Sequence, residues 1–127
     1  MKLLNGEIYT AFEALKKLSE KELPVKTSFR LAKLKIALAK LYEAIEKIRN
    51  DLVVKYGEVV KEKPGTVEIK PNSENMVKFQ EDYFKLMMEE SEVELEKVTL
   101  PLEVDGKPFE VSADVLMPLD KFIEIEG

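Results

Sequence analysis

The sequence contains no cysteine, no histidine and no tryptophan. A chain without cysteine forms no disulfide. The absence of both cysteine and histidine also rules out ordinary structural zinc sites, Ser-His-Asp triads and Cys-His dyads. Its five glycines are separated from one another, so it has no glycine-rich phosphate loop. Carboxylate chemistry is what remains. We therefore expect a protein that is not an enzyme, with no cofactor and no bound metal.

Long apolar runs are also missing. No segment approaches the eighteen or so consecutive apolar residues that a membrane span needs, and the apolar run at residues 1–6 is too short for a signal peptide. We expect a cytoplasmic protein that does not enter a membrane. At 127 residues and 45% hydrophobic content, the chain has the size and composition of a single domain, residues 1–127.

Residues 24–57 form the stretch around which the rest of the chain is organised. Its apolar residues recur at heptad spacing, which predicts one long helix with a narrow apolar stripe. The stripe comprises Leu31, Leu34, Leu38, Leu41, Ile45, Ile48 and Leu52. Pro24 suits the first helical position, and Gly57 suits a left-handed cap. Such a helix is about 50 Å long, so two further elements must cover the two halves of its stripe.

The neighbouring patterns supply those elements. Apolar spacing from Glu7 to about Lys21 predicts a shorter helix, joined by a tight link into an antiparallel helical hairpin over residues 7–57. A third helix is expected over residues 74–90, capped by Ser73, to cover the other half of the stripe. Its apolar face is Met76, Phe79, Tyr83, Leu86 and Met87.

Strands are predicted between and after these helices. Residues 58–61 and 66–69 flank a Lys63-Pro64-Gly65 turn of type II and predict a small hairpin. Alternation at residues 93–95, 100–104, 109–111 and 122–125, with Asp105-Gly106 as a turn, predicts a small C-terminal antiparallel sheet. Ser112 is expected to cap a helical turn that ends at Pro118. The fold class is α+β, with residues 58–127 completing the single domain.

Three segments carry a resemblance to a known family. Residues 5–8 (NGEI), 23–33 (LPVKTSFRLAK) and 112–119 (SADVLMPL) are similar to segments of a family of small uncharacterised proteins of tailed phages and prophages. The resemblance spans most of the chain. It implies a viral origin, and with it the host cytoplasm as location, but it carries over no functional residues.

Charge is divided between the two halves of the chain. Residues 1–57 carry a net +5 and residues 58–127 a net −10, which together give the −5 of the whole chain. Between Leu23 and Tyr42 there are five cations and no acid. Helical spacing places Lys26, Arg30, Lys33 and Lys40 along one stripe.

That stripe has two interpretations. One is a solvated face that pairs with the acidic C-terminal half. The other is a site for a small anionic ligand of nucleotide type, with Tyr42 or Phe29 stacking on the base. Duplex DNA is a poorer candidate, and we expect no binding to it, because the chain as a whole is acidic and DNA would be repelled outside that stripe.

The remaining candidates are apolar and acidic. The seam formed by Leu38, Leu41, Ile45, Ile48 and Leu52 predicts a homo-oligomer. Glu43 and Glu46 lie one turn apart, and residues 89–96 form an acidic run. A solvated surface accounts for both, although a hard-cation site would use the same residue type.

These observations favour a binding function. The leading hypothesis is a non-enzymatic phage accessory protein that sequesters a host factor or a small anionic signal, as a counter-defence. The alternative is a virion or tail-assembly protein whose helical hairpin docks on a host or viral protein. A carboxylate-and-metal hydrolase is a distant third.

Overall fold

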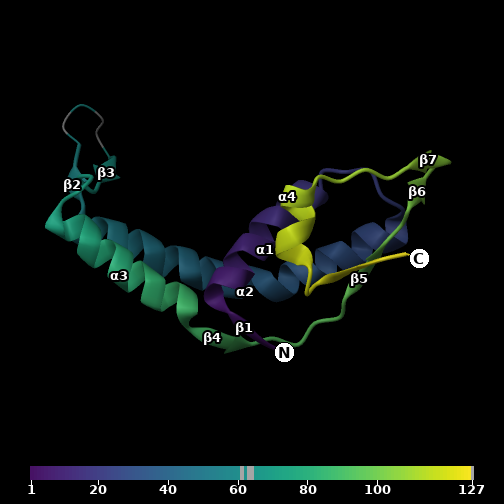
Figure 1. Cartoon of the computed structure of the whole chain (residues 1–127), viewed down its shortest axis with the longest axis horizontal. Coiled ribbons are helices and arrows are strands. Elements are labelled where there is room, and N and C mark those ends of the chain that lie inside the picture. The colour runs from purple at the N-terminus through teal and green to yellow at the C-terminus, as the bar shows by residue number, and fades with distance from the viewer. Residues whose placement is uncertain (61, 63–64, 127) are drawn as a thin grey trace.

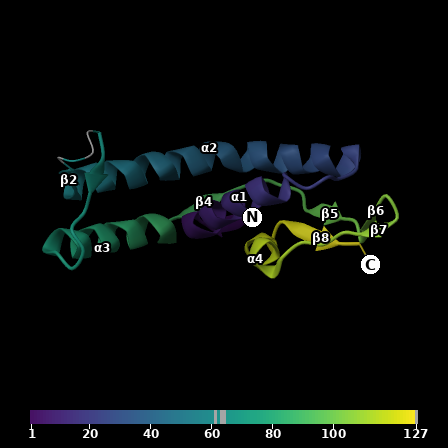
Figure 2. The ribbon, with the colours of Figure 1, turned by 90° about the horizontal axis from the view of Figure 1, so that it is seen from above.

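The structure is a computed structural model that describes residues 1–60, 62 and 65–126. Its class is α+β, as the sequence predicts. The long helix α2, Val25–Tyr56, extends along one side of an elongated molecule (Figures 1 and 2). At 1.5 Å per residue its 32 residues span about 48 Å. Helices α1, Asn5–Leu18, and α3, Glu74–Met88, lie against the same side of it.

Helix α1 covers the first half of α2 in the opposite direction. Hydrogen bonds join Tyr9 to Glu46 and Tyr42 to Glu13, so residues later in α1 meet residues earlier in α2. The core lies between them, with Ile8, Leu15 and Leu18 on α1 and Leu31 and Leu38 on α2 almost fully buried. Burial of a large aliphatic side chain contributes about 1.5–3 kcal/mol, which makes this the most stable part of the molecule. The predicted antiparallel helical hairpin is therefore present.

Helix α3 covers the second half of α2. Ser73 caps it, because its hydroxyl accepts a hydrogen bond from the Met76 amide at 3.1 Å. Tyr56 donates to Asp82 at 2.6 Å and fixes the far end of the pair. The predicted apolar face of α3 is only half-buried, and no residue of this helix is fully buried. This end of the molecule is therefore packed less densely than the α1 end.

Both early helices begin and end differently from the prediction. Helix α1 starts at Asn5 because the Glu7 carboxylate accepts the Leu4 amide at 3.0 Å, and the buried Asn5 side chain donates to the Leu86 carbonyl at 3.0 Å. It ends at Leu18 because Glu20 and Lys21 turn back onto carbonyls three residues earlier. Pro24 precedes α2 as its cap.

Gly57 follows α2 in an extended conformation with φ −92°, so the predicted left-handed cap is wrong. Glycine is needed there for space. A Cβ atom would lie 2.4 Å from the Val53 carbonyl oxygen and 2.5 Å from Cγ1 of Val67.

The strands form four separate pairs. β1, Lys2–Leu4, which the sequence did not predict, pairs antiparallel with β4, Glu90–Glu92. β2, Glu58–Val59, pairs antiparallel with β3, Val67–Glu68. This confirms the small hairpin, although Lys61 and the Lys63-Pro64 part of its predicted turn lie outside the described residues. Gly65 has φ +83°, as the third position of a type II turn requires.

The C-terminal strands depart from the prediction in their pairing. β6, Glu103–Val104, and β7, Lys107–Pro108, form the expected antiparallel hairpin around Asp105-Gly106. β5, Val98–Leu100, instead pairs in parallel with β8, Ile123–Ile125. Two short helical elements connect β7 to β8, so that β8 runs in the same direction as β5. They are α4, Ala113–Leu116, and the 3-10 turn η1, Met117–Leu119.

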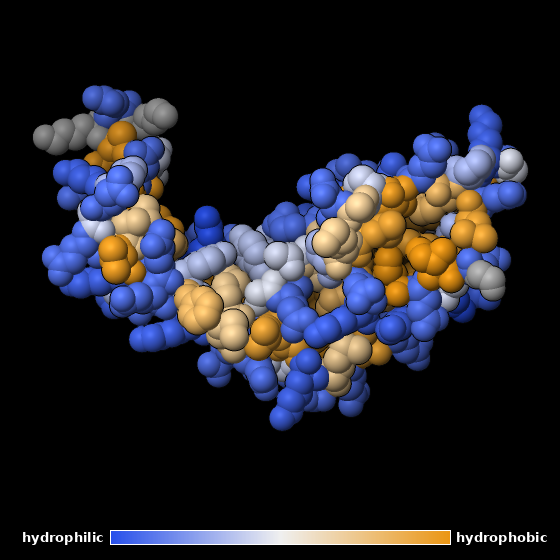
Figure 3. Space-filling model, viewed as in Figure 1, coloured by the Kyte–Doolittle hydropathy of each residue, from blue (hydrophilic) through white to orange (hydrophobic). Residues whose placement is uncertain are grey.

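Residues 93–97, predicted in part as a strand, lie in no strand. On the face opposite α2, apolar side chains gather between α4 and the β6–β7 hairpin (Figure 3). Leu102, Met117 and Ile125 are exposed in this C-terminal part.

Candidate functional site

The N-terminal half of α2 carries four of the five predicted site residues. Lys26, Arg30, Lys33 and Lys40 are all exposed on this helix. Within the described residues, none of them lies within 4 Å of a carboxylate. The basic stripe therefore forms no direct ion pair with the described residues of the acidic C-terminal half, although Arg30 and Lys33 share a groove with Glu94 and Glu96.

Tyr42 lies between α1 and α2, which disfavours stacking of its ring on a ligand, so its role in ligand binding stays a prediction. Its ring is stacked on Phe12 and Tyr9 of α1, with centroid distances of 4.3 and 5.1 Å, and Lys16 lies 5.0 Å from its centre. Its hydroxyl donates to Glu13. Burial, followed by the hydrogen bond to Glu13 and the negative charge of that carboxylate, raises the pKa of Tyr42. The side chain joins α1 to α2.

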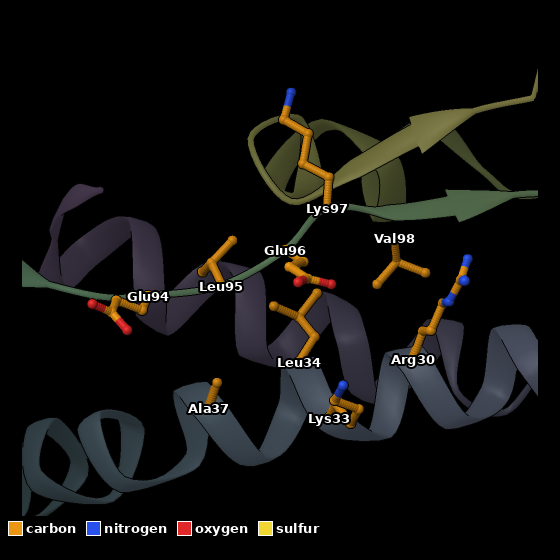
Figure 4. A pocket seen from close by; sticks show the side chains of 9 residues that line it. All are labelled: Arg30, Lys33, Leu34, Ala37, Glu94, Leu95, Glu96, Lys97 and Val98. Carbon is orange, nitrogen blue, oxygen red and sulfur yellow. The ribbon is translucent and has the colours of Figure 1, made fainter.

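Arg30 and Lys33 line a groove between α2 and the extended segment 94–98 (Figure 4). Its volume is about 570 Å³. Leu34 and Ala37 lie along the helix side, while Glu94 and Glu96 lie on the other side. Two carboxylates in the same groove disfavour a phosphate group. The groove is suited instead to a ligand with both charges.

The sequence analysis missed a second apolar stripe on α2. Val25, Phe29, Ala32 and Ile36 are separated by four, three and four residues, so they share one helix face. Val25 is 87% exposed, Phe29 64% and Ile36 72%. No element covers this side of α2 in Figure 2. The signal was present in the sequence as the same heptad spacing, but the longer leucine stripe on the opposite face dominated it.

A smaller cavity of about 300 Å³ adjoins this stripe. Ala32 and Ile36 belong to both, and Leu23 and Leu31 provide further apolar lining. We call the stripe Val25, Phe29, Ala32 and Ile36, together with this cavity, the outer face of α2. Such a cavity beside exposed apolar side chains is the usual form of an anchor pocket in a protein interface.

Cations border the outer face. Lys26, Lys33 and Lys40 each lie three or four residues from a stripe residue on one side, and Lys35 lies on the other. The Lys33 ammonium is 5.8 Å from the centre of the Phe29 ring. Three of the four residues of the predicted basic stripe therefore border an apolar surface, while Arg30 lines the groove.

The predicted subunit seam is wrong in two of its five members. Leu38 and Ile45 are buried within the chain, with 0% and 3% exposure, because α1 and its neighbours already cover them. Leu41 and Leu52 are half-buried, and Ile48 is 44% exposed. Only Ile48 offers a largely free apolar surface in that seam.

The carboxylates do not converge. Glu46 accepts a hydrogen bond from Tyr9, which separates it functionally from the exposed Glu43. Among the described residues there is no group of three or more acidic side chains placed to hold a metal ion. Nor does any described helix have the length and apolar character needed to cross a membrane.

Comparison with known proteins finds no matching family model, no matching curated protein and no matching solved structure.

Proposed function

We propose that this chain is a non-enzymatic accessory protein that sequesters a partner protein, whose acidic amphipathic helix docks on the outer face of α2. The observation that carries the proposal is the exposed stripe Val25, Phe29, Ala32 and Ile36, with three lysines along one side and Lys35 on the other. Soluble proteins rarely leave adjoining large apolar side chains exposed unless they bind something.

The spacing of the stripe specifies the shape of the partner. Four-three-four spacing is that of a helix–helix seam, in which side chains of one helix fit between those of another. Burying Val25, Phe29 and Ile36 contributes about 1.5–3 kcal/mol each. Association itself costs about 4–15 kcal/mol, so the charges must add to the affinity.

The charges specify the chemistry of the partner. Lys26, Lys33 and Lys40 along one side attract glutamate and aspartate at the flanking positions of the docked helix. A second copy placed face to face would bring these lysines against their own counterparts. The outer face therefore favours an acidic partner over self-association.

The resemblance to small proteins of tailed phages supports a viral setting in the host cytoplasm, where holding a host factor is a counter-defence. An acidic protein partner fits the structure better than a nucleotide, because Tyr42 lies in the α1–α2 interface and Glu94 and Glu96 lie beside Arg30 and Lys33.

Virion or tail assembly is the second candidate function. Leu102, Met117 and Ile125 are exposed in the C-terminal part of the chain. Figure 2 shows the C-terminal elements α4 and β8 on the opposite side of the molecule from the uncovered side of α2. Two separate apolar surfaces suit a protein that connects two others.

The proposal is tested with a labelled 18-residue amphipathic peptide that carries leucine at the seam positions and glutamate at every flanking position. A matched peptide carries lysine instead of glutamate. Fluorescence anisotropy should show micromolar binding of the acidic peptide, weakened by salt, and much weaker binding of the basic one.

Matched variants locate the binding. Phe29→Ala and Ile36→Ala should each weaken binding at least about tenfold, whereas Phe84→Ala, at an equally exposed phenylalanine on α3, should leave it unchanged. Equal binding of both peptides, or equal loss in all three variants, would overturn the proposal. A nucleotide that competes with the peptide would restore the anionic-ligand hypothesis.

A further inference from the structure

The segment 94–97 lies in the groove opposite α2 and has unpaired backbone groups. Among the described residues, no hydrogen bond is made by the amides or carbonyls of Glu94, Leu95, Glu96 or Lys97. Pairing resumes on either side, where the Val93 amide donates to Met1 at 2.9 Å and the Val98 amide donates to Phe122 at 3.0 Å. Four consecutive residues thus present an extended, unpaired edge.

The same four residues form one wall of the groove of about 570 Å³ (Figure 4). Backbone donors and acceptors beside an apolar groove are the elements that bind an extended peptide as an added strand. At about 3.3 Å per residue, the segment 94–98 has the length for a strand of four or five residues. The helix wall supplies Leu34 and Ala37 for the peptide's inward-facing side chains.

Charge is distributed unequally along the groove. Glu94 lies at the end near Ala37, and Arg30 lies at the other end near Val98 (Figure 4). Glu96 extends its carboxylate between them, close to Leu34. A peptide with a basic side chain at the Glu94 end and an acidic side chain at the Arg30 end meets opposite charge at both ends.

We infer that this groove binds an extended peptide segment of mixed charge, which pairs with the backbone of residues 94–97. The inference does not rest on the proposed docking at the outer face of α2, because Lys33 is the one residue that the two surfaces share. Pairing of two copies through this segment is disfavoured, since it would bring the Glu94 and Glu96 side chains of both copies together.

The test uses hydrogen exchange of the whole protein with the labelled peptides Lys-Val-Thr-Val-Glu and Glu-Val-Thr-Val-Lys. Both are used because the strand can run in either direction. Without peptide, the amides of residues 94–97 should exchange rapidly. The better-binding peptide should slow them at least about tenfold, and a version N-methylated at alternate residues should not, because it cannot pair.

Peptides of uniform charge, Lys-Val-Thr-Val-Lys and Glu-Val-Thr-Val-Glu, should bind more weakly than the better mixed-charge peptide. Ala37→Phe should fill the groove and abolish binding, while Ala44→Phe, at another exposed alanine of α2, should not. Phe29→Ala should also leave peptide binding intact, which separates this site from the outer face.

Three results would overturn the inference. One is slow exchange of residues 94–97 in the free protein. Another is no protection by either mixed-charge peptide at millimolar concentration. The third is ATP binding that Arg30→Ala abolishes, which would make the groove an anion site.

Discussion

Tyr42 joins α1 to α2 through both its ring and its hydroxyl. The ring stacks on Phe12, and the hydroxyl donates to Glu13, while Tyr9 makes the reciprocal bond to Glu46. Two tyrosine–carboxylate hydrogen bonds thus connect the same two helices, one with its tyrosine on α1 and the other with its tyrosine on α2. They fix the register of the helical hairpin, which positions the outer face of α2.

Removing the Tyr42 hydroxyl should destabilise the protein without affecting binding. Tyr42→Phe keeps the ring and loses a net contribution of about 0.5–1.5 kcal/mol, which lowers the melting temperature by about 4 °C. Binding of the acidic peptide should be unchanged. Loss of peptide binding in a variant that still folds would place Tyr42 back in the ligand site.

Stability should also fall at high pH through these tyrosines. The pKa of Tyr42 and Tyr9 is raised in the folded protein, so the folded state favours their protonated forms. The contribution of the protonated tyrosines to the free energy of unfolding is complete below the ordinary tyrosine pKa of 10. It is lost as the pH rises through the raised pKa of these tyrosines in the folded protein. Chemical denaturation from pH 8 upward should show a smaller decline in Tyr42→Phe than in wild type. Identical slopes would contradict this coupling.

At the scale of elements, helix α2 has two apolar stripes on opposite faces. The leucine stripe packs against the rest of the chain, and the shorter stripe that includes Phe29 remains exposed. Helix periodicity, the Ser73 cap and the Asp105-Gly106 turn predicted most of the helices and hairpins, because these signals are local. The β1–β4 and β5–β8 pairs join residues about ninety and twenty-five positions apart, and no local signal specifies such partners.

The candidate site could be predicted only in part, for the same reason. Spacing along one helix placed the four cations together. Helical spacing could not show that segment 94–97 lies opposite Arg30, or that Phe12 of α1 stacks on the Tyr42 ring. Both contacts depend on tertiary packing.

The junction between α2 and the β2–β3 hairpin should be intolerant of any side chain at Gly57. Gly57→Ala places a Cβ against backbone and Val67, and such overpacking costs about 1–3 kcal/mol. Gly65→Ala is the matched control, since nothing lies within 4 Å and its cost is only the left-handed backbone conformation, about 1–2 kcal/mol. Hydrogen exchange should show the Gly57 variant loosening the end of α2. Faster exchange at the end of α2 in the Gly65 variant alone would contradict the close packing described around Gly57.

Helix α3 should contribute moderately to stability. Phe79→Ala removes a half-buried ring, so its cost should fall below the 3–5 kcal/mol of a fully buried phenylalanine, at about 2 kcal/mol. Phe84→Ala removes an exposed ring and should cost less than about 0.5 kcal/mol. Urea denaturation compares the two. Equal effects would mean that α3 does not pack through its predicted face.

At the scale of the whole molecule, an elongated protein presents one long helix along its side (Figure 2). The homo-oligomer stays a prediction, and Ile48 is the seam residue that can test it. Ile48→Glu should lower the mass measured by light scattering while preserving the fold, whereas Ile45→Glu should unfold the chain because Ile45 is buried. A wild-type protein that is monomeric at high micromolar concentration would contradict the predicted homo-oligomer.

The central claim is that the outer face of α2 selects its partner by charge. The most direct measurement is a charge swap, Lys26→Glu with Lys33→Glu and Lys40→Glu, titrated with the acidic and the basic amphipathic peptides. None of these lysines forms an ion pair within the described residues, so the variant should still fold. We predict that the variant loses the acidic peptide and gains the basic one. A folded variant that still prefers the acidic peptide would contradict the account.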